Sequence, residues 1–159
     1  MNVGDLTHLT GSGHVHMVDV GEKAGTARRA VARAKVRLGP AARDAIRSGT
    51  APKGDVAAVA RVAAILAAKR TAELVPLCHP VLLTSVTVEV AVVDDGVEVR
   101  VAVHCAGQTG VEMEAMTGAA IGALTVYDMI KGIERGAVIE AVELLEKSGG
   151  RSGAWAREP

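Results

Sequence analysis

The sequence has almost no aromatic residues. Its 159 residues include no Phe, one Trp and one Tyr, although 49% of them are hydrophobic. A core must therefore be built from Val, Ala, Leu and Ile, which allow close approach of helices and sheets but bury little area each. Oligomerisation would compensate for this small buried area, so we expect a homo-oligomer. The length suits one domain with its own core.

The chain also lacks an excess of charge of either sign, and it has few cysteines. Its 18 basic residues equal its 18 acidic residues, which argues against a nucleic-acid partner bound by bulk electrostatics. A local basic pocket for phosphate remains possible. Cys78 and Cys105 fit a reducing compartment better than a disulfide scaffold. No signal-peptide pattern or uninterrupted apolar run is present, so we expect a cytoplasmic protein without a membrane partner.

Alternation of apolar and polar residues and turn signals predict an α+β fold. Strands are expected at 29–38, 84–93, 97–105 and 138–146, with the start of another near His14; helices are expected at 40–47, 56–72 and 109–131. This order predicts a ferredoxin-like two-layer sandwich, an antiparallel sheet with helices on one face. We expect a flexible N-terminal arm at 1–13, a single catalytic domain at 14–153 and a disordered tail at 154–159.

Two faces can be assigned from these patterns. The strand at 29–38 has an alanine-rich inner face and a basic outer face, which we expect to be solvated. The helix at 56–72 is rich in Ala and carries an apolar stripe. Its members are Val59, Val62, Ala63, Leu66 and Ala67.

The helix at 109–131 is apolar in the middle and charged at both ends. Buried charges are costly unless they are paired or used. Glu114 and Asp128 lie 14 residues apart, which is about 21 Å along a helix. One small ligand cannot contact both in one chain, so either one end is catalytic or subunits share a site. An ordinary Asp128–Lys131 ion pair is the alternative. Thr109 is the expected N-cap.

Several cations flank this core in loops or at element ends. Lys53 precedes a helix start, where an anion would balance its charge, and His79 lies between two prolines that hold it in place. A lysine near other cations has a lowered pKa in principle. Solvated loop residues are the alternative. The neighbouring Cys and His pairs lack zinc-site spacing, and no metal site is predicted.

Seven motifs in order resemble the molybdenum cofactor biosynthesis protein C family, the cyclic pyranopterin monophosphate synthases. They are MVDV at 17–20, KGD at 53–55, AAKRT at 67–71, PLCHP at 76–80, TGVEMEAMT at 109–117, YDMIK at 127–131 and KSGGRSG at 147–153. The resemblance spans roughly residues 6–153.

The resemblance implies an enzyme that converts 3′,8-cyclo-7,8-dihydro-GTP to cyclic pyranopterin monophosphate and releases pyrophosphate. It implies homohexamers, trimers of dimers, with sites between subunits. We expect no required cofactor, with Mg²⁺ as an option alongside the phosphates. The implied catalytic residues are Asp128, Lys131 and Lys53. The implied substrate contacts are Leu77, Cys78, His79, Glu112, Met113, Glu114, Arg28, Lys147 and Arg151.

Two positions depart from the family pattern. Gln108 stands where Lys is common, which puts one cationic contact in doubt, and Gly132 stands where Ala is usual, which loosens that helix end. Two alternatives stay open at this stage. One is a non-catalytic nucleotide-binding ferredoxin-like module, and the other is a structural oligomer whose helix charges form interface ion pairs.

Overall fold

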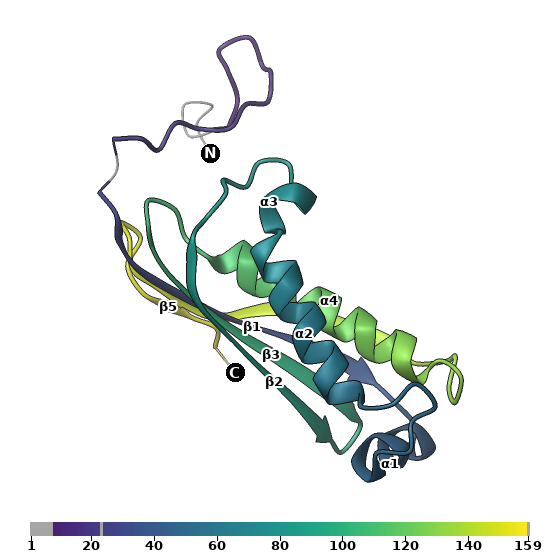
Figure 1. Ribbon diagram of the computed structural model, residues 1–159. Coiled ribbons are helices and arrows are strands. Elements are labelled where there is room, and N and C mark those ends of the chain that lie inside the picture. The colour runs from purple at the N-terminus through teal and green to yellow at the C-terminus, as the bar shows by residue number, and fades with distance from the viewer. Residues whose placement is uncertain (1–7, 23, 159) are drawn as a thin grey trace.

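The computed structural model describes residues 8–22 and 24–158, within which the chain forms four helices and one five-stranded antiparallel sheet. The strand order is β2-β3-β1-β4-β5, and α2 and α4 cross one face of the sheet (Figure 1). The ferredoxin-like two-layer prediction is thus confirmed. The elements are β1 (Thr26–Arg37), α1 (Pro40–Ser48), α2 (Val56–Lys69), α3 (Thr71–Leu74), β2 (Leu83–Val93), β3 (Gly96–Gly107), α4 (Glu112–Ile130), β4 (Val138–Ser148) and β5 (Trp155–Ala156).

Strand β1 lies at the centre of the sheet, between β3 and β4. Its inward residues Ala30, Ala32, Ala34 and Val36 are fully buried, as the alternation predicts. Four valines of β3, at 97, 99, 101 and 103, are equally buried beside them. The core is therefore made of small aliphatic side chains, and the strand begins three residues earlier than the predicted position 29.

Small residues also set the packing of the two long helices. The buried residues of α2 are mostly alanines, which face α4 and the sheet. On α4, a Cβ atom added to Gly122 would lie 2.8 Å from Val99 Cγ1 and 3.3 Å from Ala64 Cβ. A side chain at this position would force Val99 to shift, so close approach of the layers depends on glycine and alanine.

The apolar stripe of α2 is exposed to solvent at its larger members. Val59, Val62 and Leu66 are 43%, 58% and 49% exposed, and they form an outward face that we call the α2 apolar face. Because the helix approaches α4 closely, its alanines face inward and its bulkier residues face outward. The helix also ends at Lys69 rather than Ala72, and α3 follows as a separate turn.

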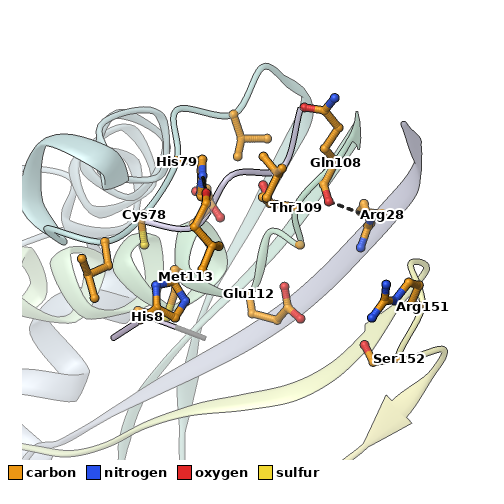
Figure 2. Close-up of a pocket in the computed structure, with 16 residues that line it drawn as sticks. His8, Arg28, Cys78, His79, Gln108, Thr109, Glu112, Met113, Arg151 and Ser152 are labelled. Carbon is orange, nitrogen blue, oxygen red and sulfur yellow. Dashed lines mark hydrogen bonds between the residues drawn. The ribbon is translucent and has the colours of Figure 1, made fainter. Parts of the chain in front are cut away.

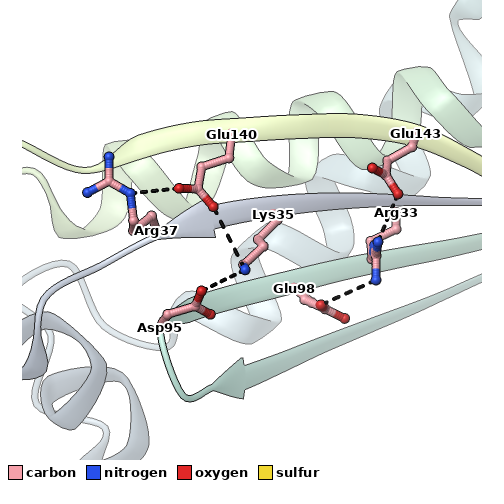
Figure 3. A network of polar contacts seen from close by, with 7 residues as sticks. All are labelled: Arg33, Lys35, Arg37, Asp95, Glu98, Glu140 and Glu143. Atoms are coloured by element: carbon pink, nitrogen blue, oxygen red, sulfur yellow. Dashed lines mark hydrogen bonds and ion pairs between the residues drawn. The ribbon is translucent and has the colours of Figure 1, made fainter. Parts of the chain in front are cut away.

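The basic outer face of β1 is paired with acids of β3, of β4 and of the turn between β2 and β3 (Figure 3). Arg33 lies 2.8 Å from Glu143, and Lys35 lies 2.7 Å from Asp95. The hydrogen bond between the latter two raises the pKa of Lys35 and lowers the pKa of Asp95. The expectation of a simply solvated face is therefore corrected: these charges neutralise each other across three strands, although each exposed pair stabilises the fold little.

Both ends of the chain differ from expectation. Residues 14–17 form no strand; one isolated bridge joins Leu9 to Val15 within a turn. At the other end, where a disordered tail was expected, Trp155 and Ala156 form β5 and pair with β4. Backbone hydrogen bonding explains this order, since the Arg157 N–H also donates to the Leu145 carbonyl at 2.7 Å. Residues 1–7 of the expected N-terminal arm lie outside the described residues.

In the part of the chain that the structure describes, we find no helix with the length and apolar character needed to cross a membrane.

Candidate active site

A cavity of about 400 Å³ lies where the N-terminal segment, the start of β1, the 77–81 loop and the start of α4 meet. We call it the main pocket (Figure 2). Eight of the nine expected substrate contacts line it, and Lys147 does not. The eight are Arg28, Leu77, Cys78, His79, Glu112, Met113, Glu114 and Arg151.

Arg28 and Arg151 give one side of the main pocket its positive charge (Figure 2). The Arg28 guanidinium donates to the Gly107 carbonyl at 3.2 Å and to the Gln108 carbonyl at 3.0 Å, so its position is fixed. Gly150 lies directly against this guanidinium with a φ of 72°, and any side chain there would collide with it. The glycines of the 147–153 loop therefore allow the loop to close over Arg28.

Two acids of the first turn of α4 form the floor of the main pocket. Glu114 is only 4% exposed, and burial raises the pKa of its carboxyl, with the Glu112 charge adding to the effect. Burial of Cys78 likewise raises the pKa of its thiol, and the negative charge of an ionised Glu114 adds to this effect. Burial favours the protonated form of Glu114, the form that can donate a hydrogen bond to a ligand, and it favours the neutral, weakly reactive thiol of Cys78.

The helix start itself differs from the prediction. Helix α4 begins at Glu112, and Val111 occupies the N-cap position without a side-chain hydrogen bond. Thr109 is thus not the N-cap; instead it lines the main pocket with Gln108 and Gly110. Glu112, the first residue of the helix, places an acidic side chain at this end, where negative charge is favoured.

His79 holds the opposite side of the main pocket. Its Nε2 lies 2.7 Å from the Val18 carbonyl oxygen. Because a carbonyl only accepts, Nε2 carries the hydrogen in this contact. The 77–79 loop is therefore joined to the N-terminal segment, which contributes His8, Val18 and Val20 to the lining. Sequence reasoning missed these wall residues because the segment has no secondary-structure period; the MVDV motif was the one signal pointing to it.

The three expected catalytic residues form a second cluster. Asp128 lies 2.6 Å from the Lys53 ammonium and 2.8 Å from the Lys131 ammonium. The Lys131 hydrogen bond, followed by that of Lys53, lowers the pKa of Asp128 to about 2. The same contact raises the pKa of Lys131. The expected lowering of a lysine pKa by neighbouring cations is therefore wrong for Lys131, because the nearest charge is a carboxylate.

Lys53 reaches this cluster from the loop before α2. Asp55 caps that helix by accepting from the Ala58 N–H at 2.9 Å. The positive charge that seemed unfavourable next to a helix start is balanced by Asp128 in this chain. All three members remain about half exposed, so a ligand can approach them.

The two clusters lie at opposite ends of α4. None of Lys53, Asp128 and Lys131 lines the main pocket. In Figure 1, the loop between α1 and α2 and the end of α4 lie at one end of the molecule, and α3 and the N-terminal segment lie at the other. The expectation that one chain cannot bring both helix ends to a single small ligand agrees with this arrangement.

Lys147 stands beside the main pocket rather than in its wall. Its ammonium donates to the Ser152 hydroxyl, and Ser152 does line the main pocket. Lys147 itself lines a smaller cavity with Arg29 and Trp155. Of the two basic residues of the 147–153 loop, Arg151 is therefore the one that reaches the wall of the main pocket.

No group of three or more His, Cys, Asp or Glu side chains in residues 8–22 and 24–158 is arranged to hold a metal ion. The binding groups of both clusters are instead cations, carboxyl groups and one imidazole, which suit an anionic organic ligand.

Comparison with known proteins gives the class. A family model described as the MoaC family matches residues 17–150. The cyclic pyranopterin monophosphate synthase of Novosphingobium aromaticivorans is 52% identical over 153 residues, covering 96% of this chain and 98% of that protein. The protein of the same name from Thermomicrobium roseum is 54% identical over 158 residues, covering 98% of this chain and 95% of its own. This chain belongs to the MoaC family.

Proposed function

We propose that this protein is an enzyme that converts 3′,8-cyclo-7,8-dihydro-GTP to cyclic pyranopterin monophosphate and releases pyrophosphate, a step of molybdenum cofactor biosynthesis. The observation that carries the proposal is the similarity, above 50% identity over nearly the whole of both chains, to proteins named cyclic pyranopterin monophosphate synthase. The chemistry of the two clusters supports it.

The main pocket suits the nucleotide part of this substrate. Arg28 and Arg151 can balance phosphate charge, and their guanidinium groups match phosphate oxygens well. A protonated Glu114 and the His79 ring can bond the nitrogen and oxygen atoms of a purine-derived ring. Lys147, one hydrogen bond away through Ser152, would join the phosphate contacts once the loop adjusts to a ligand.

The Lys53–Asp128–Lys131 cluster suits the proton transfers and the cyclisation. Closing the cyclic phosphate forms a bond from a substrate hydroxyl oxygen to the α-phosphorus, breaks the bond to the pyrophosphate oxygen and releases the hydroxyl proton to water. Negative charge then develops on the leaving pyrophosphate, and the two ammonium groups stabilise it. Asp128 keeps Lys131 protonated and oriented, so Lys131 is the proton donor and Asp128 its positioning partner.

A complete site needs both clusters, and their separation along α4 supports a site shared between subunits. Glu114 and Asp128 are about 21 Å apart along the helix axis. The α2 apolar face supplies exposed Val59, Val62 and Leu66 for a subunit interface. We propose a homohexamer, a trimer of dimers, in the cytoplasm, where the two cysteines stay free. No resident cofactor is needed, and Mg²⁺ would act only as a counter-ion of the phosphates.

The test is pyrophosphate release from enzymatically prepared cyclised nucleotide. The wild-type protein should turn the nucleotide over, and Asp128→Ala and Lys53→Ala should lose most of this activity while they keep the oligomeric mass of the wild type. Binding without turnover by the wild type would instead favour a non-catalytic nucleotide-binding module. Near wild-type rates from both intact variants would refute the assigned catalytic roles.

A further inference from the structure

Residues 16–22 cross the main pocket as a strap, and few contacts attach the strap to the rest of the chain. Among the described residues, two side-chain hydrogen bonds join it to the body of the protein. His79 donates to the Val18 carbonyl at 2.7 Å, and the Gln108 carboxamide Nε2 donates to the Gly21 carbonyl at 3.1 Å. The strap is therefore held by side chains at two points rather than by strand pairing.

The strap also determines the position of His8. The His16 N–H donates to the His8 carbonyl at 2.9 Å, and the His8 ring Nδ1 lies 3.2 Å from the His16 carbonyl oxygen. These two contacts close the turn formed by residues 8–16 at its base. His8 lines the main pocket at the end of this turn. Any movement of the strap at His16 therefore moves His8 relative to the cavity.

The strap supplies one wall of the main pocket. Val18 and Val20 give this wall apolar surface, and His8 gives it a ring nitrogen. Because the His16 carbonyl only accepts, His8 Nδ1 carries a hydrogen, and in the tautomer with its hydrogen on Nδ1 the Nε2 atom is an acceptor. Such a wall fits the flat, N–H-bearing ring system of a purine-derived nucleotide better than it fits the phosphates.

Gln108 joins this wall to the basic side of the main pocket. Its main-chain carbonyl accepts from Arg28, and its side chain holds Gly21. We propose that Gln108 is a positioning residue, whose carboxamide keeps the strap closed and so keeps His8, Val18 and Val20 in the substrate site. This inference rests on the proposed function for the identity of the ligand, but the closure of the strap can be measured without any ligand.

The first experiment measures strap opening in the ligand-free protein. Thermolysin cuts before apolar residues such as Met17, Val18 and Val20, and its cleavage rate under native conditions follows the population of the open form. Gln108→Met keeps the length of the side chain and removes the N–H donor. Cleavage in the strap, located by mass spectrometry, should become about threefold to tenfold faster, as expected for the loss of one hydrogen bond.

Three further variants control this result. Gln108→Glu also lacks the donor and should open the strap as well, whereas Gln108→Lys restores an N–H donor and should return cleavage towards the wild-type rate. Arg61→Met removes another side-chain donor to a backbone carbonyl, that of Val88 at 3.2 Å, far along the chain from the strap. It should leave strap cleavage unchanged. Equal cleavage of the wild type and Gln108→Met would overturn the proposal.

The second experiment measures pyrophosphate release from the cyclised nucleotide. Opening of the strap should raise KM by about the same factor as cleavage, with kcat nearly unchanged, because Gln108 positions a binding wall rather than the reacting groups. A lower kcat at unchanged KM would also overturn the proposal. If the wild type releases no pyrophosphate, the proposed function fails, while the cleavage rates still decide whether Gln108 closes the strap.

Discussion

Burial of a single carboxyl group gives this fold a testable pH dependence. Glu114 is 4% exposed, and burial raises its pKa above 4.5 in the folded state. Between a pH of about 4.5 and the raised pKa, the folded protein holds a proton on Glu114 that the unfolded chain has released. The free energy of unfolding therefore falls as pH rises through this range, and it levels off above the raised pKa. Glu114→Gln, which stays neutral, should remove this fall.

The measurement for Glu114→Gln is the free energy of unfolding by urea between pH 5 and 9, at one fixed protein concentration because self-association makes stability depend on concentration. The variant should gain stability relative to the wild type with rising pH. Glu112→Gln, on the same helical turn, is the matched control and should show a smaller change. Parallel curves for the wild type and Glu114→Gln would contradict the assignment of a raised pKa.

The elements of the fold show where sequence patterns were sufficient and where they were not. Strict alternation predicted which residues of β1 are buried. Successive side chains of a strand point to opposite faces, and in the stretch predicted as a strand the charged residues all fall on one of them. In α2 nearly every residue is apolar, so periodicity could not select a face. The close approach of α4 put Ala60 and Ala64 inside and left Val62 outside. The strap was not predictable from local patterns either, since within residues 8–22 and 24–158 it is held to the body by tertiary hydrogen bonds from His79 and Gln108.

The same close approach predicts opposite effects for two glycines. A Cβ at Gly122 would lie 2.8 Å from Val99, whereas a Cβ at Gly132 would meet nothing within 4 Å. Gly122→Ala should therefore destabilise the protein by about 1 kcal/mol or more, because overpacking outweighs the gain in helix propensity. Gly132→Ala should be neutral or slightly stabilising. Thermal unfolding of both variants at equal concentration checks this, and equal melting temperatures would contradict it.

At the scale of the whole molecule, the separation of the two clusters makes subunit mixing the most direct test of a shared site. His79→Ala damages the main pocket at the start of α4, and Asp128→Ala damages the cluster at its end. Each variant alone should be nearly inactive. When the two are unfolded together and refolded as mixed oligomers, some sites receive an intact main pocket from one subunit and an intact Asp128 from its neighbour.

Random mixing of equal amounts predicts that about one quarter of the sites are intact, so pyrophosphate release should recover to about 25% of the wild-type rate. The double variant His79→Ala with Asp128→Ala provides the control. When the double variant is mixed with an equal amount of wild-type chains, the intact sites are those in which both halves come from wild-type subunits, about one quarter of the total. Pyrophosphate release from this mixture should not exceed about 25% of the wild-type rate. If the mixed single variants stay inactive although they form oligomers of wild-type mass, both clusters act within one chain, and the 21 Å helix span (14 residues at about 1.5 Å each) must be bridged by movement of that chain.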